Sequence, residues 1–319
     1  MKEISDYITS LELGTPQLYK NIALVPLMGK ESKLEYIVFD EAVNSGLEVR
    51  ETGSVPTLHM KNKTGKEIVI MQGEFVEGGK QNRMVATNVY MAKDFDGDVP
   101  VNCVQHHRWS GSGSGFDTSH GRATKSVNYA SFAGQSAVWD EVRSLAADKG
   151  VHSASENIGD IYTEKKQDIG EYVRQFSYVP GAVGLVIFTQ KNGSKDFTAD
   201  IFDQSRTLQK NFRKLLESYV LEALMLGSDV NASTQEVLDF LGMLKNVSYK
   251  ERKPVSLGRD FMLQGQTIVG SAIVYQDIPV YTTFGKHTQD WHVQKPIEFP
   301  ELVIPHDGFP GHIRTGLRR

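Results

Sequence analysis

The sequence predicts an α+β fold with a strand-rich N-terminal third, a helical middle, and a C-terminal part that mixes strands and helices. Short apolar or alternating segments follow one another up to Val104, which is typical of strands. Apolar residues at helical spacing replace them over residues 120–176. Strands and helices do not alternate at regular βαβ spacing, so the pattern favours an α+β fold over a doubly wound parallel sheet.

The N-terminal third begins with a predicted short helix, because Ile4, Ile8 and Leu11 lie at helical spacing. Strands are then predicted over residues 18–27, 36–42, 47–51, 58–62, 68–71, 85–91 and 99–104. Residues 94–98, Asp-Phe-Asp-Gly-Asp, are predicted to form a polar turn that returns the last strand antiparallel to the one before it. They do not fit an EF-hand calcium loop, because the Gly is fourth and not sixth and no closing Glu follows.

Two helices are predicted in the middle of the chain, over residues 120–149 and 155–176, packed as an antiparallel pair. The Gly-Ser-Gly-Ser-Gly segment before them lacks the Lys-Ser/Thr of a phosphate-binding P-loop and is predicted to be a flexible loop that could cover a ligand. The remaining predicted elements are strands over 182–189 and 197–202 joined through Asn192-Gly193, a helix over 208–224, a short helix capped at Ser233, and strands over 261–263, 268–275 and 280–284.

The composition is that of an ordinary globular protein, with one large α+β domain expected over residues 1–290 and an extended or mobile tail over residues 291–319. A subdivision near residues 111–118 is left open. The formal net charge of −4 argues against binding to nucleic acid or to an acidic membrane. The single cysteine excludes an intramolecular disulfide and a cysteine-based zinc cage. No apolar signal segment or membrane-length run is present, so a cytoplasmic location is expected.

Residues 73–83, Gly-Glu-Phe-Val-Glu-Gly-Gly-Lys-Gln-Asn-Arg, are the first candidate binding segment. Lys80 and Arg83 carry positive charge, and Gln81 and Asn82 add directional hydrogen bonds, a combination suited to an anion. The glycine pair before them permits positive φ and close backbone approach, as an anion-binding turn needs. The alternative, left open, is a tight turn followed by a solvated polar strand.

The candidate catalytic residues are Glu74 and His107. Glu74 and Glu77 stand near the two cations and could act as general acid or base, or hold Mg²⁺ against a pyrophosphate; the alternative is a structural ion pair. His107 could titrate near neutral pH, although a surface histidine is the commoner outcome. His106 and His107 are expected to face opposite sides of a strand, so they are not assigned as ligands of one metal. The cofactor is unknown, and any metal is expected to be oxygen-held Mg²⁺ or Mn²⁺ rather than structural zinc.

Arg108 and Trp109 form the second candidate binding segment. A guanidinium and an indole can pair with and stack on a nucleotide; the alternative is a core Trp beside a surface Arg. The predicted turn at residues 94–98 is expected to bring this segment close to Lys80 and Arg83. Cys103, in an apolar run just before it, is expected to be a buried apolar residue rather than a nucleophile.

These two segments, with residues 181–186, 200–202, 258–261, 270–272 and 283–285, resemble the ARG- and rhodanese-phosphatase-superfamily-associated protein domain. The resemblance covers roughly residues 15–290, and the Lys-Gln-Asn-Arg and Arg-Trp blocks are its most specific parts. The family's association with ADP-ribosylglycohydrolases and phosphatases implies a role near ADP-ribose or NAD-derived metabolites. Gln105 stands where the family is expected to carry a glutamate, so this chain would lack that group if it were a catalytic acid or base.

Two functions follow from these observations. The first is a cytoplasmic domain that binds, and could process, an ADP-ribose- or NAD-derived phosphate metabolite. Its ligand-binding residues would be Lys80, Gln81, Asn82, Arg83, Arg108 and Trp109. The second is a non-catalytic interaction or assembly protein in which the Lys-Gln-Asn-Arg segment is structural. An open cleft lined by these side chains would favour the first function, and burial in ion pairs the second; enzymatic activity and homo-oligomer formation are left open.

Overall fold

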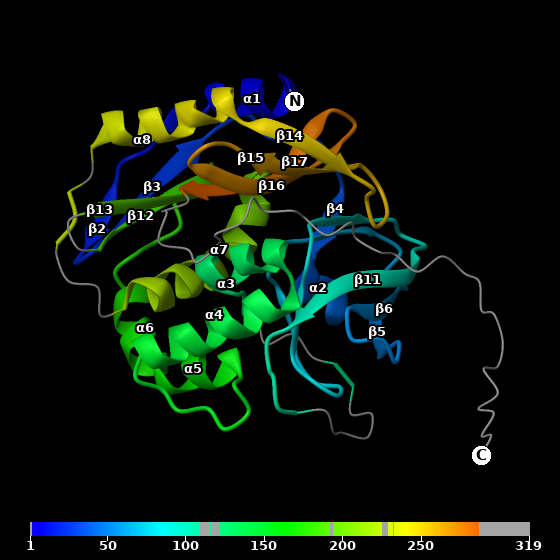
Figure 1. Ribbon diagram of the computed structural model, residues 1–319. Coiled ribbons are helices and arrows are strands. Elements are labelled where there is room, and N and C mark those ends of the chain that lie inside the picture. The colour runs from blue at the N-terminus through cyan, green and yellow to red at the C-terminus, as the bar shows by residue number, and fades with distance from the viewer. Residues whose placement is uncertain are drawn as a thin grey trace, which may run out of the picture.

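A nine-stranded antiparallel sheet forms the largest layer of the structure (Figure 1). This computed structural model describes residues 2–108, 115–116, 121–191, 194–224, 229–231 and 233–286, so the predicted tail and most of residues 111–118 lie outside it. The strand order is β1-β3-β12-β13-β17-β16-β15-β14, and β2 pairs with β3 outside this path. The strands are β1 (Glu12–Leu13), β2 (Gln17–Tyr19), β3 (Ile22–Met28), β12 (Ala182–Lys191), β13 (Ser194–Phe202), β14 (Ser248–Arg252), β15 (Arg259–Gln264), β16 (Ile268–Tyr275) and β17 (Ile278–Lys286).

Hairpins build much of this sheet. β12 and β13 pair up to Lys191↔Ser194, so the two strands predicted to be joined through Asn192-Gly193 do form a hairpin, whose turn lies outside the described residues. Gln276 and Asp277 join β16 to β17 with φ of 50° and 59°, the two-residue turn whose twist matches that of the strands. The sequence analysis missed β14, because this edge strand is polar and mostly exposed and therefore has no apolar alternation.

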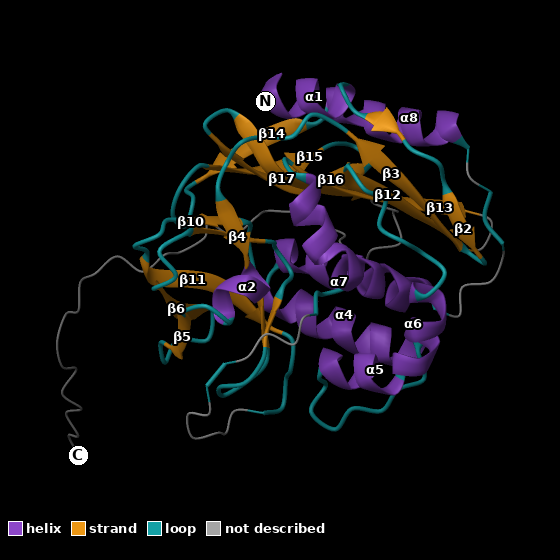
Figure 2. Ribbon diagram, turned by 180° about the vertical axis from the view of Figure 1, so that it is seen from behind, coloured by secondary structure: helices purple, strands orange, loops and turns teal. Residues whose placement is uncertain are grey.

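Helices cover both faces of the nine-stranded sheet (Figures 1 and 2). On one face lie α1 (Lys2–Thr9), α8 (Thr234–Gly242) and the 3-10 helix η2 (Met243–Asn246). On the other face lie α7 (Ser205–Ala223) and, beyond it, α3 (Lys125–Ala130), η1 (Ser131–Ala133), α4 (Gln135–Asp148), α5 (Ile158–Glu164) and α6 (Lys166–Val173). The predicted stripe of α7 is buried against the sheet, with Leu208, Leu215 and Leu216 in the core. None of the helices in the described ranges is both long and apolar enough to cross a membrane.

The two predicted middle helices are each divided. Thr124 caps the start of α3 by accepting a hydrogen bond from the Val127 backbone N–H, and Gly134, with φ of 99°, separates η1 from α4. Asn157 caps α5 in the same way through the Gly159 N–H. Lys165 then interrupts the helical path before α6. Apolar spacing alone did not reveal these breaks, because the apolar stripe continues across them.

Two smaller sheets and α2 form a β-rich region beside the helices (Figure 1). The three-stranded sheet has the order β10-β7-β4, and the five-stranded sheet has the order β5-β6-β11-β9-β8. The elements are β4 (Tyr36–Val38), α2 (Phe39–Val43), β5 (Leu47–Glu51), β6 (Thr57–Asn62), β7 (Glu67–Ile70), β8 (Phe75–Val76), β9 (Arg83–Val85), β10 (Val89–Met91) and β11 (Asp96–Cys103). Their apolar side chains, including Met60, Val85 and Val99, form a core cluster of their own.

Two predictions for this region are wrong. The strand predicted over residues 36–42 ends at Val38, where the Glu41 carboxylate accepts a hydrogen bond from the Val38 N–H and α2 begins. The strand predicted over residues 85–91 is divided into β9 and β10, and the predicted hairpin with β11 forms only through β9. β10 pairs with β7 instead. Between β9 and β10, Asn88 Oδ1 accepts a hydrogen bond from the Gln72 N–H, just beyond the end of β7.

Asp203 is a buried carboxylate between β13 and α7. It accepts hydrogen bonds from the Tyr36 hydroxyl and, at 2.5 Å, from Ser32 Oγ. The Tyr36 hydroxyl also lies 2.7 Å from Thr207 Oγ1, which connects β4 to the start of α7. Burial raises the pKa of Asp203 to about 6, because desolvation outweighs these hydrogen bonds.

This pKa predicts a pH-dependent loss of stability. A carboxyl whose pKa is higher in the folded state stabilises the fold while it is protonated, and this contribution is lost as pH rises from about 4 to 6. Two pH units correspond to about 3 kcal/mol. The free energy of unfolding of Asp203→Asn, relative to the unsubstituted protein, should therefore rise by up to about 3 kcal/mol between pH 4 and pH 7. Urea unfolding at several pH values measures this, and parallel curves for the two proteins would contradict it.

Candidate functional site

The Gly78–Gly79 turn lies in the hairpin between β8 and β9. Both glycines have positive φ, 114° and 52°, as the sequence analysis expected of this turn. A Cβ on Gly79 would lie 2.3 Å from the Phe116 ring and 2.5 Å from Glu51 Oε1, so the position also has no room for a side chain. Phe116, from the segment after the glycine-serine loop, therefore lies against this turn.

The four residues after the glycine pair all have contacts inside the protein. Arg83 is wholly buried, donates to the Gln81 carbonyl at 2.8 Å, and lies 3.5 Å from Glu51 Oε2. Gln81 is also buried and donates to the His106 carbonyl at 2.9 Å. The Asn82 side chain accepts from the Gly78 N–H and donates to Asn157 Oδ1. Lys80 is half-buried, and its backbone N–H donates to Glu51 Oε1 at 2.7 Å.

The Arg108 guanidinium joins the two candidate segments. It donates to the carbonyls of Gly79 and Gly78, at 3.3 and 3.4 Å, and to Asn82 Oδ1 at 3.0 Å. We call this arrangement the Arg108 clamp. β9 and β11 pair at Arg83↔Cys103, so the predicted meeting of the two segments is confirmed, although only part of the predicted hairpin forms. Trp109 lies outside the described residues, and Cys103 is buried as expected.

The Gln105 side-chain amide is hydrogen-bonded to the Arg108 clamp. Its Oε1 accepts from Arg108 Nε at 2.7 Å and from the Asn82 N–H at 3.3 Å, while its Nε2 donates to Ser155 Oγ at 2.9 Å. The amide therefore accepts and donates at once, which a carboxylate cannot do. Gln105, which stands where the family is expected to carry a glutamate, therefore connects the Arg108 clamp to the loop before α5.

Glu74 lies in the core, away from the Arg108 clamp. Its carboxylate accepts from Lys214 Nζ at 2.6 Å and from the Met71 N–H at 2.7 Å. Lys214 is also 2.8 Å from Asp40. Burial raises the pKa of Glu74, whereas Glu74 and Asp40 raise the pKa of Lys214 against the opposing effect of its own burial. Glu74 is thus in an ion pair whose partner is Lys214 of α7, and not Lys80 or Arg83. Glu77, from the same candidate segment, is half-buried.

His106, His107 and Glu156 come together just beyond the end of β11. His106 Nδ1 lies 3.0 Å from Glu156 Oε2, and His107 Nε2 lies 3.4 Å from Glu156 Oε1. The expectation that the two histidines face opposite sides of a strand is wrong, because the strand ends at Cys103 and both residues lie in a bend. Arg143 Nη1 donates to the same carboxylate at 2.9 Å. Desolvation opposes ionisation of Glu156, but the hydrogen bonds from Arg143 and His106 outweigh it and lower the pKa of Glu156.

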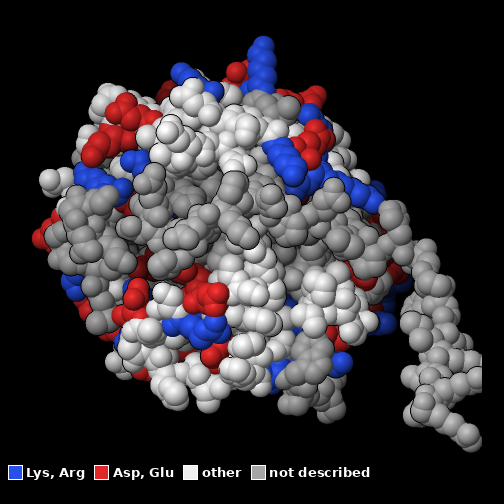
Figure 3. Space-filling model, viewed as in Figure 1, with Lys and Arg blue, Asp and Glu red and all other residues white. Residues whose placement is uncertain are grey.

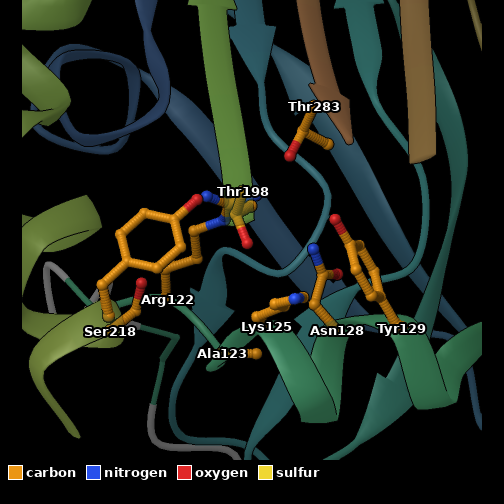
Figure 4. Close-up of a pocket in the computed structure, with 9 residues that line it drawn as sticks. Arg122, Ala123, Lys125, Asn128, Tyr129, Thr198, Ser218 and Thr283 are labelled. Carbon is orange, nitrogen blue, oxygen red and sulfur yellow. The ribbon is translucent and has the colours of Figure 1, made fainter. Parts of the chain in front are cut away.

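A small polar pocket between the nine-stranded sheet and α3 and α7 was missed by the sequence analysis (Figure 4). Buried Arg122 is one of the residues that line it, and it donates to Asp200 Oδ1 at 3.1 Å and to the Tyr281 hydroxyl at 2.8 Å. The pocket has room for about one water molecule, too little for a nucleotide. Asp200 was the available signal, since a lone carboxylate inside an apolar strand needs a buried partner. The lining residues are Arg122, Ala123, Lys125, Asn128, Tyr129, Thr198, Ser218, Tyr219 and Thr283.

Charge on the visible surface is mixed rather than collected by sign. In Figure 3, acidic and basic atoms lie beside each other among the residues that are coloured. Any anion site on this face of the described structure would therefore be local, as the net charge of −4 suggests.

The model of the ARG and Rhodanese-Phosphatase-superfamily-associated Protein domain matches residues 10–284, which include both candidate segments, the Arg108 clamp and the buried Glu74 pair. No curated protein and no solved structure matches the chain at a significant level.

The burial of Arg83 predicts that it contributes mainly to stability. Arg83→Ala should lower the free energy of unfolding by about 3–5 kcal/mol without ligand, because it leaves Glu51 without this cation in a largely buried site. Arg50→Ala is the matched control, since Arg50 is exposed and pairs with Glu48 at the surface; it should change stability by less than about 1 kcal/mol.

The pairing itself can be isolated with Glu51→Gln. In that background Arg83→Ala should cost less than it does in the unsubstituted protein, because no carboxylate is left behind. Denaturant unfolding of all four proteins measures the coupling. Equal stability of Arg83→Ala and Arg50→Ala would show that Arg83 is not a structural residue.

Proposed function

Because the chain belongs to the ARG and Rhodanese-Phosphatase-superfamily-associated Protein domain family, we propose that it binds a small phosphate-bearing metabolite of the ADP-ribose or NAD-derived class at the Arg108 clamp. The ligand class follows from the family's association with ADP-ribosylglycohydrolases and phosphatases. The proposed location follows from the arrangement of the cationic side chains.

The observation that carries the proposal is the position of the Arg108 guanidinium over the Gly78–Gly79 turn. Its two carbonyl contacts, at 3.3 and 3.4 Å, are longer than a typical N–H···O bond. They can be exchanged for shorter, charge-assisted bonds to phosphate oxygens, which a planar guanidinium makes in pairs. Lys80 directly follows this turn in the chain and exposed His107 directly precedes Arg108, so both are candidates for further contacts with a ligand bound there.

The proposal divides the predicted binding residues into two groups. Lys80 and Arg108 would contact the phosphate, and a base would stack on the half-buried Phe116 ring beside the glycine pair. Gln81, Asn82 and Arg83 would act indirectly, by holding the turn in place through their internal contacts. His107 is the exposed candidate for proton transfer, whereas the contacts of Glu74 are with Lys214 in the core.

A second candidate function is a non-catalytic interaction or assembly protein. It is favoured by the burial of Arg83 and Gln81, whose polar atoms bond to the protein's own backbone. Under this alternative the Arg108 clamp would be a structural connection and no small anion would bind there.

Titration calorimetry of the full chain with ADP-ribose, NAD, AMP and inorganic phosphate tests the proposal. At least one of the nucleotides should bind, and Lys80→Ala should weaken it about ten- to a hundredfold, the effect of losing a charge-assisted contact. Lys80→Ala keeps the backbone bond to Glu51, so the turn should remain folded. Lys250→Ala, on the exposed strand β14, is the matched control and should bind as the unsubstituted protein does. Absence of binding by all four compounds, or equal affinities of both variants, would favour the second candidate.

A further inference from the structure

We propose that His106, His107 and Glu156 form a binding site for a divalent transition-metal ion, Zn²⁺ being the ion that fits best. The inference does not rest on the proposed binding of a phosphate metabolite. It contradicts the expectation from the sequence that any metal would be an oxygen-held Mg²⁺ or Mn²⁺. Among the described residues, these three form the group of histidine and carboxylate side chains whose donor atoms all lie within 4.8 Å of one another.

Two distances between donor atoms are close to those of a tetrahedral site, and all the donor atoms lie within 4.8 Å of one another. With metal–ligand bonds of about 2.0–2.1 Å, neighbouring donors of a tetrahedron lie about 3.3–3.4 Å apart. The two histidine–carboxylate distances are 3.0 Å, to Glu156 Oε2, and 3.4 Å, to Glu156 Oε1. Small side-chain rotations would therefore place one ion between both imidazoles and the carboxylate.

The backbone holds the two loops that supply these ligands together. The N–H groups of His106 and His107 both donate to the Ser155 carbonyl, at 3.0 and 3.2 Å, and Gln105 and Asn157 form a β-bridge. Glu156 lies between these contacts with a φ of 47°. A residue with a side chain adopts this left-handed conformation at a cost in free energy, and it persists only where the surroundings enforce it. This backbone conformation places the Glu156 side chain where an unstrained backbone conformation would not place it.

The imidazole rings are also held from the side. The His106 ring lies on Trp139, with centroids 4.1 Å apart, and on the His107 ring, at 4.2 Å. Such packing restricts ring rotation, so less freedom remains to be lost when a metal binds. Metal-binding sites commonly fix their histidines through surrounding groups in this way.

Arg143 and a metal ion would compete for the Glu156 carboxylate. Its guanidinium bonds to Glu156 and to Asp140, and its side chain is 42% exposed. It can therefore leave Glu156 for Asp140 or solvent when a divalent ion arrives. Removing Arg143 should tighten metal binding, an effect that a purely structural role of the cluster does not predict.

The donor set selects the class of ion. Two imidazole nitrogens and one carboxylate suit Zn²⁺ and neighbouring transition metals, whereas Mg²⁺ and Ca²⁺ prefer all-oxygen sites. Three protein ligands leave an open coordination position, as in zinc sites that bind water or a substrate oxygen. Because His107 directly precedes Arg108, that position would lie near the Arg108 clamp.

Metal titration of the full chain, first stripped with a chelator, tests the site. The probes are Zn²⁺ by calorimetry and Co²⁺ by visible absorption, whose intensity reports tetrahedral coordination. His107→Ala and Glu156→Gln should each weaken one binding event about ten- to a hundredfold or more, since losing a ligand costs at least as much as losing a group that only supports one. Arg143→Gln should bind Zn²⁺ more tightly than the unsubstituted protein, and excess Mg²⁺ should not displace the ion.

His152→Ala is the matched control, because His152 is an exposed histidine between α4 and α5 outside the cluster, and its titration should match that of the unsubstituted protein. Circular dichroism of each variant separates loss of the site from loss of the fold. If Glu156→Gln destabilises the loop, the Arg143→Gln result still decides the matter. Identical isotherms for the unsubstituted protein, Glu156→Gln and Arg143→Gln would overturn the proposal and leave the cluster as a hydrogen-bonded connection between two loops.

Discussion

The rest of the structure depends on two buried ion pairs, Glu74 with Lys214 and Arg122 with Asp200. Their side chains are at most 4% exposed. A buried charge without its partner is costly, so the elements that carry these residues are tied to one mutual arrangement. Lys214 ties α7 to the β-rich region, and Asp200 ties β13 of the nine-stranded sheet to the segment before α3. A backbone bridge between Glu74 and Arg122 connects the two pairs.

The constraint extends from this core to the surface in steps. Glu74 is the residue before β8, so its ion pair with Lys214 sets where the β8–β9 hairpin starts. Glu51 holds the far end of that hairpin through the Lys80 N–H and the Arg83 guanidinium. The Arg108 clamp then holds the outer side of the turn. Each step uses a charged or amide group internally, which is why a segment rich in such groups is mostly buried.

The side chains that could exchange their present partners for a ligand or a metal ion lie near the surface, beyond the buried ion pairs. Arg108 and Arg143 are half-exposed or exposed, and His107 is exposed. Water competes for their bonds, so giving up an existing contact costs little there compared with the core. Ligand or metal binding therefore costs less at the Arg108 clamp and the His106–His107–Glu156 cluster than at the Arg122 pocket, where buried Arg122 is bonded to Asp200 and Tyr281.

The sequence by itself determined the structural features that depend on residues close together in the chain. Periodicity indicated the α+β class and the stripe of α7, Asn192-Gly193 indicated the β12–β13 hairpin, and two adjacent glycines indicated a turn with positive φ. The predicted turn at residues 94–98 also indicated that Arg108 would come close to Lys80 and Arg83. Only the tertiary structure decided the partners of the charges. Glu74 and Lys214 are 140 residues apart, and Arg122 and Asp200 are 78 apart. Local patterns carry no information on such distant pairs, since these form only when whole elements pack. The end of β11 at Cys103 turned His106 and His107 to the same carboxylate for the same reason: the pairing of strands, not the residues alone, sets where a strand stops.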